Sequence, residues 1–304
     1  MKKITVAIPC HNEDLTIEKV VNDFKRELPE CRILVVDNNS KDKTAQKARE
    51  AGILVISEKK QGKGYAVQRI FNEFKDDILI LVDGDDTYSA KDVHKLIAPV
   101  AEEEAEMVVG NRIHSSNNKV FSGSHWLGNK FLTLSLNILF GAKLQDMESG
   151  FRAIDKKFVS TSALLAGGFG IEPELTIQAL ERGMRIKEVP ISLVSRKEGS
   201  HSKLNTIRDG TVVLYTIISL FRDYKPLQFF SLLAGIFFLI GAGLGWYSVR
   251  DYVQTGIVYH IPSLIVAGLS LLSAFISFIA GLVLSSIKRR QEELLVILNR
   301  KTGF

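Results

Sequence analysis

The sequence predicts an α/β fold, with a mostly parallel β-sheet and flanking helices, followed by two helices that span a membrane. Short, apolar, β-branched runs alternate with helical patterns in the first part of the chain, which is typical of βαβ crossovers and a parallel sheet. Two later stretches, 227–249 and 261–287, contain no Asp, Glu, Lys or Arg. Each exceeds the roughly 20 residues that cross the hydrocarbon of a bilayer as a helix.

Five runs are expected to form strands because they are short, apolar and rich in β-branched residues. They are 4–8, 33–36, 53–56, 78–82 and 107–110. The run 78–82 is apolar at every position, which predicts a strand buried on both faces of the sheet. In an open parallel sheet, ligands bind beyond the carboxyl ends of the strands. The polar residues that follow each run are therefore the candidates for a functional site.

Two stretches after residue 110 have the apolar spacing of amphipathic helices, one near 124–140 and one near 204–222. Each is expected either to lie in a membrane interface or to pack on the sheet. Both alternatives stay open for the first, whereas the second runs almost directly into an apolar stretch, which favours the interface. The expected organisation is a domain at 1–222 that includes both of these helices, membrane helices at 227–249 and 261–287, and a tail at 288–304.

The distribution of basic residues predicts how the membrane helices are oriented. Arg222 and Lys225 precede the first apolar stretch, and three basic residues at 288–290 follow the second. The link at 250–260 has a single arginine beside an aspartate. Because basic loops stay on the cytoplasmic side, the large domain and both termini of this integral membrane protein are expected in the cytosol. No signal peptide is expected, since two lysines lead directly into the first strand.

Composition narrows the classes of partner. The net charge of +5 is modest, and its basic residues gather where the anionic headgroups of a bilayer would attract them. The sequence has no recognisable nucleic-acid module and no aromatic-basic platform, so no nucleic-acid partner is expected. Its two cysteines are too few for a disulfide scaffold or a thiolate zinc site.

The strongest chemical signal is the acidic sequence Asp83-Gly84-Asp85-Asp86, which follows the apolar run 78–82. Carboxylates at alternate positions can share a hard divalent cation, and Mg²⁺ or Mn²⁺ ordinarily binds through one or two carboxylates plus phosphate oxygens. Asp83 and Asp85 are therefore the metal candidates. An ordinary acidic turn is the alternative, because Asp and Gly are common in turns. The position at a strand end favours the metal site.

Three further loops carry polar residues toward the same edge of the sheet. The sequence Pro9-Cys10-His11-Asn12-Glu13 ends the first strand, and Asp37-Asn38-Asn39-Ser40 ends the second. Their amides and carboxylates can converge on a base and ribose, while Asn39 or Ser40 can also cap the next helix. The sequence Gln61-Gly62-Lys63-Gly64 lacks the spacing and the Ser or Thr of a P-loop. Lys63, at a helix start, can still meet a phosphate or sugar.

Taken in order, these motifs resemble those of the family 2 glycosyltransferases, specifically the branch that acts on polyprenyl phosphates such as dolichyl and undecaprenyl phosphate. The resemblance runs from Ile4 to about Phe221, and the helix pair that follows is similar to that of members with two membrane helices. It implies a GT-A fold, which is a Rossmann-like arrangement. The matching segments are Pro9 to Glu13, Asp37 to Ser40, Gly62 to Gly64, Asp83 to Asp85, Ser149 to Arg152 and Arg196 to Leu204.

The resemblance implies roles for individual residues. The first two loops hold the nucleotide, the acidic sequence holds the donor and its metal, Arg112 faces the acceptor phosphate, and a basic loop at 196–204 closes over the diphosphate. The residues implied in donor binding are Pro9, Asn12, Glu13, Asp37, Asn39, Lys63, Asp83, Asp85 and Ser202. Those implied in the reaction itself are Asp85, Arg112, Arg196 and Lys203. Arg152 and Glu172 fall in further motifs of the family's site. Structural salt bridges would explain both residues equally well.

Two positions depart from the pattern of the family. Members often carry a second basic residue early in the first interfacial helix, where this chain has Ser124-His125 and only later Lys130. That departure puts a second contact to the acceptor phosphate in doubt. The loop at 37–40 reads Asp-Asn-Asn-Ser where Asp-Asp-Gly-Ser is usual, so its nucleotide contacts are expected to differ.

The predicted reaction is inverting transfer of a hexose from a nucleotide diphosphate sugar to polyprenyl phosphate. The resemblance favours UDP over GDP and leaves glucose, N-acetylglucosamine and mannose open. The second pKa of a phosphate monoester lies near about 6, so the acceptor is already an anion and needs no general base. Small residues recur four apart in both apolar stretches, at Gly241 and Gly245 and at Ser273, Ser277 and Gly281. They predict close packing, either within the helix pair or between subunits of a homo-oligomer.

Two other functions are considered. A processive polysaccharide synthase is disfavoured, because two membrane helices can hardly line a polymer channel and the Gln-x-x-Arg-Trp signature of those enzymes is absent from the sequence. A non-catalytic membrane scaffold that binds nucleotide sugars is the second. It is disfavoured because a scaffold has no need to gather metal ligands and phosphate binders at one place.

Overall fold

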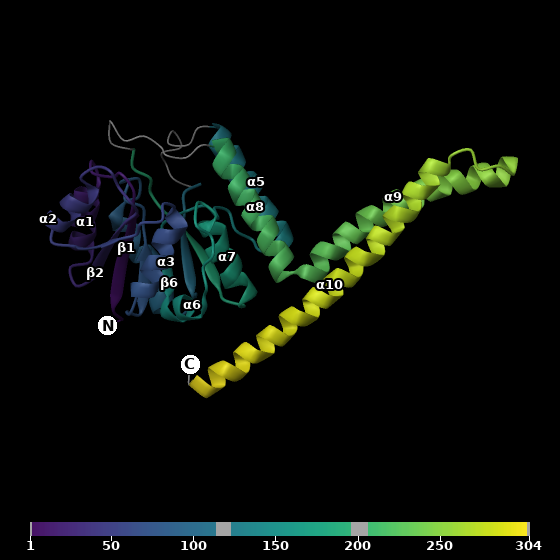
Figure 1. Ribbon diagram of the computed structural model, residues 1–304. Helices are drawn as coiled ribbons and strands as arrows, with labels where there is room; N and C mark the ends of the chain where they lie inside the picture. The colour runs from purple at the N-terminus through teal and green to yellow at the C-terminus, as the bar shows by residue number, and fades with distance from the viewer. Residues whose placement is uncertain (1, 114–122, 196–205, 303–304) are drawn as a thin grey trace. The chain divides into compact units, whose positions relative to one another are not determined.

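The computed structural model describes residues 2–113, 123–195 and 206–302 (Figure 1). Arg196, Ser202 and Lys203, which the sequence places in a loop over the diphosphate, lie outside these residues. The chain divides into two compact units, Met1–Ile217 and Ile218–Phe304, and each is described by itself.

The first unit is built on a seven-stranded sheet in the order β3-β2-β1-β4-β6-β5-β7. Its strands are β1 (Ile4–Cys10), β2 (Arg32–Asp37), β3 (Leu54–Ser57), β4 (Ile78–Leu81), β5 (Met107–Asn111), β6 (Arg152–Asp155) and β7 (Ile186–Pro190). The five strands predicted from the sequence are confirmed, and they run in one direction. Both pairings of β6 are antiparallel, and β7 pairs in parallel with β5.

The sequence analysis missed β6 and β7 for physical reasons. β6 is short and begins with a buried arginine, Arg152, which an apolar pattern excludes. β7 includes Lys187 and Glu188 and lies at the edge of the sheet, where side chains reach water. Neither strand has the continuous apolar run that identifies a central strand.

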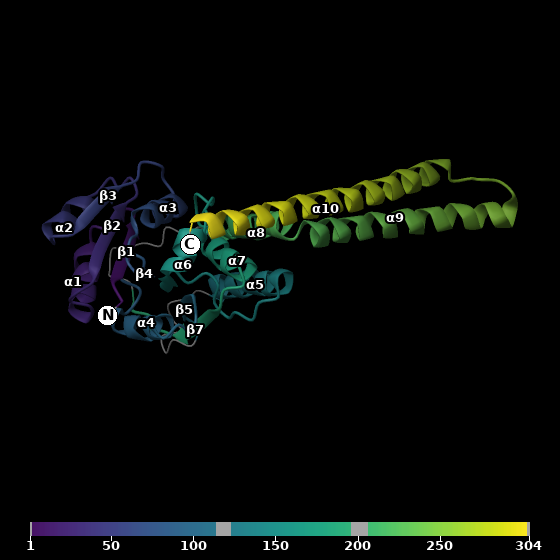
Figure 2. The same cartoon turned by 90° about the horizontal axis from the view of Figure 1, so that it is seen from below.

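Helices cover both faces of the sheet (Figure 2). Their bounds are α1 (Ile17–Glu27), α2 (Thr44–Glu50), α3 (Lys63–Glu73), the 3₁₀ turn η1 (Ala90–Asp92), α4 (Val93–Ala101), α5 (Gly123–Phe140), α6 (Lys156–Thr161), α7 (Ile171–Glu181) and α8 (Thr206–Tyr224). Apolar residues of α1 and α4 pack on one face, and those of α3, α6 and α7 pack on the other. Helix α8 crosses the boundary between the two units.

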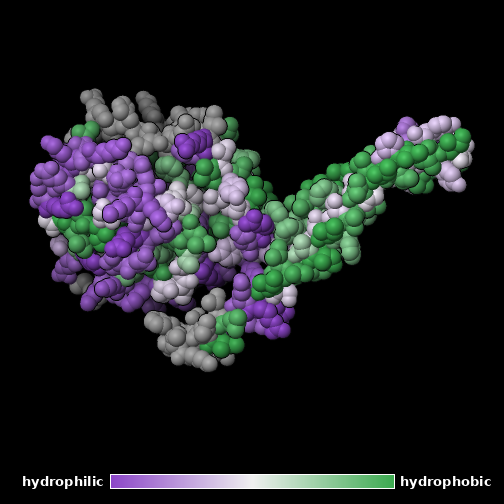
Figure 3. All heavy atoms as spheres, in the orientation of Figure 1, coloured by the Kyte–Doolittle hydropathy of each residue, from purple (hydrophilic) through white to green (hydrophobic). Residues whose placement is uncertain are grey.

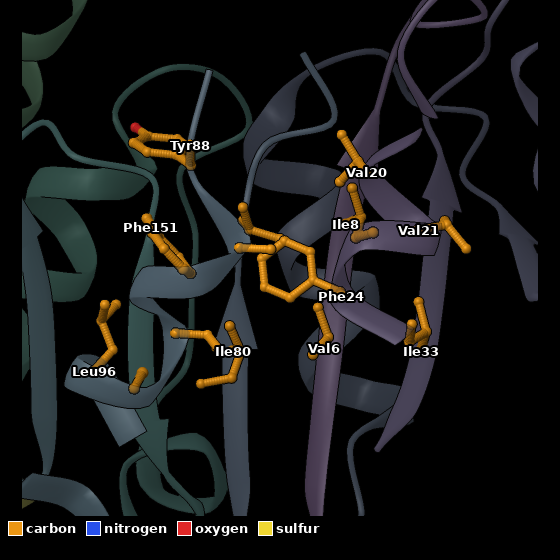
Figure 4. Packing of buried hydrophobic residues seen from close by; sticks show 14 of the residues in the cluster. Val6, Ile8, Val20, Val21, Phe24, Ile33, Ile80, Tyr88, Leu96 and Phe151 are labelled. Carbon is orange, nitrogen blue, oxygen red and sulfur yellow. The ribbon is translucent and has the colours of Figure 1, made fainter. Parts of the chain in front are cut away.

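Helix α1 shows how the sequence selects its buried face. Ile17, Val20, Val21 and Phe24 recur at helical spacing, and all four are buried against the sheet. Phe24 lies among the side chains of β1 and β4 (Figure 4). Its ring meets that of Phe151 edge-on, with centroids 6.0 Å apart. Since Phe151 belongs to the segment 149–152 singled out in the sequence, the core directly supports a candidate site motif.

The second unit is a pair of long helices, α9 (Pro226–Thr255) and α10 (Ile261–Thr302). Both are long and apolar enough, by length and composition, to cross a membrane. Hydrophobic residues cover most of their visible surface (Figure 3). Glycines let the two helices pack closely, because a Cβ added at Gly241 would lie 2.8 Å from Leu271 Cγ and one at Gly281 2.9 Å from Phe230 Cβ. These glycines therefore serve the helix pair itself, and homo-oligomer formation stays a prediction.

Phe24→Ala is expected to lower the free energy of unfolding of the first unit by about 3–5 kcal/mol, because it removes a buried ring from the centre of the core. Thermal unfolding of the purified protein in detergent measures the change. Leu54→Ala removes an apolar side chain that is 50% exposed and is expected to change stability far less. Equal losses in the two variants would contradict this assignment of the core.

Candidate active site

A cavity of about 560 Å³ opens at the carboxyl ends of the parallel strands. It is lined by the loops that follow β1, β4 and β5, by the start of α3, and by residues of α5, α7 and α8. The sequence-predicted residues on its wall are Pro9, Asn12, Glu13, Lys63, Asp83, Asp85 and Arg112. Asp37, the last residue of β2, and Asn39, in the loop after it, do not line this cavity, whereas Asn38 between them does.

The acidic loop after β4 is held in one conformation by its neighbours. Asp85 Oδ1 accepts hydrogen bonds from the backbone N–H and the hydroxyl of Thr87, at 3.2 and 2.6 Å. The Thr16 hydroxyl, at the start of α1, donates to the Gly84 carbonyl at 2.7 Å. Asp86 turns away from the cavity and forms an ion pair with Lys19 at 2.6 Å. The structure therefore separates the two metal candidates on the cavity wall from the third aspartate of the sequence.

Lys63 bridges two carboxylates at the centre of the wall. Its ammonium lies 2.6 Å from Asp83 Oδ1 and 2.6 Å from Glu172 Oε1, and its side chain is largely buried. Burial alone would lower the pKa of Lys63, but the charges of Asp83 and Glu172 outweigh it and raise that pKa. Contact of Lys63 with a phosphate or sugar stays a prediction, and Glu172 takes part in this ion pair.

Two glycines make the approach of these segments possible. A Cβ added at Gly150 would lie 2.5 Å from Asp83 Oδ2 and 2.9 Å from Lys63 Nζ. One added at Gly64 would lie 1.8 Å from the Ala166 carbonyl oxygen in the loop before α7. Both distances are shorter than nonbonded atoms allow, so only glycine fits at either position without a shift of the backbone.

Arg152, whose role the sequence left open, is fully buried beside this cluster. Its Nε donates to the Ser149 carbonyl at 2.9 Å, its Nη1 to the Thr176 hydroxyl at 2.9 Å, and its Nη2 to the Met147 carbonyl. These bonds tie the segment 147–149 to α7. The structure therefore gives Arg152 a supporting role behind the cavity wall.

The hydrogen bonds and backbone conformation of the loop after β2 give a physical reason why its sequence departs from the usual Asp-Asp-Gly-Ser. The Asn38 amide donates to the Lys60 carbonyl at 2.6 Å and accepts from the Gly62 N–H at 2.7 Å. An aspartate could accept from Gly62 but could not donate to Lys60, so the amide suits both ends of this contact. Asn39 has φ +58, a conformation that asparagine tolerates better than most residues and that glycine adopts freely.

Asp37 is buried, and its Oδ1 has no hydrogen-bond partner within the part of the chain that the structure describes. A buried carboxylate oxygen without a donor costs free energy, so such an atom usually has a partner in the working state of a protein. This observation is independent of the motif that singled out Asp37 in the sequence.

Arg112, on the cavity wall, forms a two-pronged ion pair with the buried Asp146. Nε of Arg112 lies 2.7 Å from Asp146 Oδ2, Nη2 lies 2.7 Å from Oδ1, and the Arg112 backbone N–H donates to Oδ2 at 3.0 Å. Burial would raise the pKa of Asp146, but the Arg112 charge outweighs it and lowers that pKa. Sequence reasoning missed Asp146. The only signal available was its place three residues before Ser149, inside a segment already singled out.

Glu148 is a second carboxylate that sequence reasoning missed. It lines the cavity, and burial raises its pKa to about 7. The nearby charges of Glu172 and Asp146 add to this rise in pKa, and the charge of Arg112 opposes it. No sequence pattern could have identified Glu148, because its environment comes from segments far apart in the chain.

A match to a protein-family model identifies the family of this chain. Residues 5–161, just over half of the chain, match the model of glycosyl transferase family 2. The chain belongs to family 2 of the glycosyltransferases. This confirms the family that the motif order resembles, and it makes the protein an enzyme of the glycosyltransferase class.

Curated relatives of this glycosyltransferase share most of its length. Glycosyltransferase AglJ of Haloferax volcanii is 27% identical over 263 residues, which cover 86% of this chain and 86% of that protein. The UDP-N-acetylglucosamine–dolichyl-phosphate N-acetylglucosaminyltransferase of Methanococcus voltae is 28% identical, over 72% of this chain and 96% of that protein. The match thus extends beyond the sheet in both relatives.

The fold is also shared with a solved structure, glucosyl-3-phosphoglycerate synthase from Mycobacterium tuberculosis in complex with Mn²⁺, UDP-glucose and phosphoglyceric acid. The TM-score is 0.61 at 22% sequence identity, and the match covers 72% of this chain and 80% of that one. This likeness concerns the fold alone. It confirms the expected GT-A type of α/β architecture for the glycosyltransferase.

The cavity of this glycosyltransferase combines two kinds of charge. Asp83 and Asp85 present carboxylates where a cation can bind, and Arg112 presents a guanidinium on the wall of the same cavity. Such an arrangement suits a substrate that arrives with a cation and a second substrate that carries its own negative charge.

Glu148→Gln is expected to stabilise the glycosyltransferase at pH 8 by about 3 kcal/mol and to have little effect near pH 4.5. The folded-state pKa of about 7 exceeds the ordinary value of 4.5, so the folded protein holds this proton more tightly. Stability is therefore lost as the pH rises from 4.5 to 7, and glutamine removes that loss. Melting temperatures at the two pH values measure it.

The matched control for this change is Glu30→Gln, which alters an exposed glutamate. It is expected to leave the pH dependence of the melting temperature as in the parent protein. A Glu148→Gln variant whose melting temperature follows the parent at both pH values would show that Glu148 does not titrate in this way.

Proposed function

We propose that this glycosyltransferase moves a hexose from a UDP-sugar to polyprenyl phosphate at the cytosolic surface of a membrane. The proposal depends on one observation: a single cavity carries the Asp83 and Asp85 carboxylates and the Arg112 guanidinium, in a chain that also has two long apolar helices. UDP-glucose and UDP-N-acetylglucosamine are the favoured donors, and GDP-mannose is the alternative.

The donor side of the proposal follows from the loops after β1 and β2. Pro9, Asn12 and Glu13 line the cavity, and Asp37 offers a buried oxygen that a nucleobase N–H would satisfy. We propose that these residues, with Asn39, bind the nucleoside. The relative from Methanococcus voltae is named for UDP-N-acetylglucosamine and dolichyl phosphate, which supports both a UDP-sugar and a polyprenyl acceptor here.

We propose that Asp83 and Asp85 hold Mg²⁺ or Mn²⁺ together with the donor diphosphate. Among residues 2–113, 123–195 and 206–302 there is no group of three or more His, Cys, Asp or Glu side chains able to hold a metal ion. Two carboxylates with phosphate oxygens are an ordinary ligand set for these ions. The residues present therefore fit a metal that arrives with the nucleotide, and such a metal would stabilise charge on the leaving diphosphate.

On the acceptor side, Arg112 is proposed to bind the phosphate of the polyprenyl lipid. A phosphate oxygen attacks the anomeric carbon of the sugar while the bond to the nucleoside diphosphate breaks, with inversion, and the electron pair leaves on the diphosphate. Arg196, Ser202 and Lys203 are proposed to contact that diphosphate, as the family resemblance implies. The acceptor needs no deprotonation, because its second pKa lies near about 6.

Helix α5 supports a location at the membrane surface. Its inward side chains, among them Leu132 and Leu136, are buried. An outward row remains exposed and apolar, and it includes Leu127, Phe131 and Ile138, which are 63%, 57% and 72% exposed. The helix thus packs on its own domain and still presents an apolar face, so the two alternatives left open by the sequence are compatible. We propose that this face and helix α8 lie in the bilayer interface.

We further propose that α9 and α10 cross the membrane and that the domain and both termini lie in the cytosol. Because the acceptor lipid cannot leave the bilayer, an enzyme anchored there meets it at a raised effective concentration. This gives the helix pair a chemical purpose that a water-soluble acceptor would not require.

The test is direct transfer by the purified full-length protein in nanodiscs. A panel of UDP-glucose, UDP-N-acetylglucosamine and GDP-mannose is offered with Mn²⁺ or Mg²⁺ and a polyprenyl phosphate. We expect one donor to yield a chloroform-soluble glycolipid and to yield none when the metal is chelated. A protein that binds donors but never forms a glycolipid would support the scaffold alternative and refute this proposal.

Asp85→Asn is expected to reduce turnover roughly 100-fold or more, because it removes the charge that holds the donor's metal. The melting temperature of the variant is expected to stay near that of the parent. Mn²⁺ binding in the presence of UDP, measured by calorimetry, should weaken in parallel with turnover.

Asp86→Asn is the matched control for Asp85→Asn, since it makes the same chemical change one residue later. Asp86 pairs with Lys19 outside the cavity, so its variant should keep Mn²⁺ binding and most of the turnover. Comparable losses of Mn²⁺ binding in both variants would rule out a specific metal role for Asp85.

A further inference from the structure

The Asp146 carboxylate is hydrogen-bonded both to Arg112, on the cavity wall, and to helix α5. Besides the Arg112 guanidinium, its Oδ1 accepts a hydrogen bond from the Asn129 amide at 2.9 Å. Asn129 is buried on the inward side of α5 and also lines the cavity. One carboxylate oxygen thus joins the loop after β5 to a helix whose opposite side is exposed and apolar.

The orientation of the Asn129 side chain is fixed by the next turn of the same helix. The Thr133 hydroxyl donates to Asn129 Oδ1 at 3.1 Å, which leaves the amide nitrogen of Asn129 facing Asp146. Thr133 also accepts from the Met147 N–H at 3.4 Å. Helix α5 therefore holds the Asp146 segment through two polar side chains rather than through apolar packing alone.

The far side of the same segment is fixed by Glu188 of β7. Its two carboxylate oxygens accept from the backbone N–H groups of Gln145 and Asp146, each at 2.8 Å. The segment is thus clamped between the edge strand and α5. With its backbone held by Glu188, the Asp146 carboxylate is oriented by two donors besides the Arg112 guanidinium: the Arg112 backbone N–H at Oδ2 and, from helix α5, the Asn129 amide at Oδ1.

We infer that Asn129 is a positioning residue for the acceptor: through Asp146 it sets the direction in which Arg112 presents its guanidinium to the phosphate of the lipid. The inference rests on the proposed acceptor role of Arg112. The ion pair is formed by Nε and Nη2 of Arg112. A carboxylate that tilts would turn the planar guanidinium with it, because two parallel hydrogen bonds hold the groups in one plane.

The inference also links substrate recognition to the membrane. Asn129 and Thr133 lie on the inward side of α5, and the exposed apolar side chains lie on the outward side. The helix proposed to rest on the bilayer is therefore hydrogen-bonded to the residue that holds Arg112. The family motifs do not carry this connection, because Asn129 lies outside the six segments through which the chain resembles the family.

The test uses Asn129→Leu in the full-length protein in nanodiscs with polyprenyl phosphate as the varied substrate. Leucine has a similar size and cannot donate to Asp146. We expect the KM for polyprenyl phosphate to rise about tenfold, with kcat and the KM for the donor within about twofold of the parent values, because a hydrogen bond to a charged group is lost on the acceptor side alone.

Asn137→Leu is the matched control, because Asn137 is on the same helix and hydrogen-bonds Leu144 in the same connection, at 2.8 and 3.1 Å, without touching Asp146. Its melting temperature is expected to fall with no change in the KM for polyprenyl phosphate. If Asn129→Leu behaves like this control, Asn129 has a purely structural role and the inference is overturned.

Thr133→Val keeps the inference testable if Asn129→Leu does not fold. Valine matches threonine in shape but cannot orient the Asn129 amide, so a smaller rise of the same KM is expected. An unchanged KM for polyprenyl phosphate in folded Thr133→Val would then overturn the inference. A parent protein that forms no glycolipid at all would instead refute the proposed function, so the two failures are distinguishable.

Discussion

The ion pairs of Lys63 are the interaction on which the rest of the active site depends. A buried ammonium requires opposite charge around it, and Asp83 and Glu172 supply it from the loop after β4 and from the start of α7. These segments are far apart in the sequence and approach closely only because Gly64 and Gly150 have no side chain. The position of Asp83 is thus a property of the whole sheet edge rather than of the acidic loop alone.

Two ion-pair clusters at the cavity wall are built on the same physical pattern. In one, Lys63 is held between two carboxylates, and in the other Arg112 is held by the buried Asp146. In each case charged groups face one another in a fixed geometry before any substrate arrives. Catalysis gains from such preorganisation, because charge that develops in the reaction meets groups already in place.

Residues whose partners are close in the sequence, or whose position at a strand end is fixed by the fold, could be identified without a structure. Asp83 and Asp85 follow the buried β4, and the five parallel strands follow from apolar runs. Asp146, Glu148 and Asn129 could not be identified, because their surroundings come from residues far along the chain. Asp146 and Arg112, for example, are 34 positions apart. Local patterns predict where a loop lies and not which side chains it meets.

The reversed direction of β6 has a consequence for how the chain can vary. An antiparallel strand places its beginning beside the ends of its neighbours, so the segment 147–151 reaches the reactive edge on its way into the sheet. It is part of the connection 141–151, which starts where α5 ends at Phe140 and finishes where β6 begins at Arg152. Most surface loops tolerate added residues, but a lengthened connection here would displace α5 relative to the edge of the sheet that carries the cavity. We therefore regard its length as one of the most constrained dimensions of the enzyme.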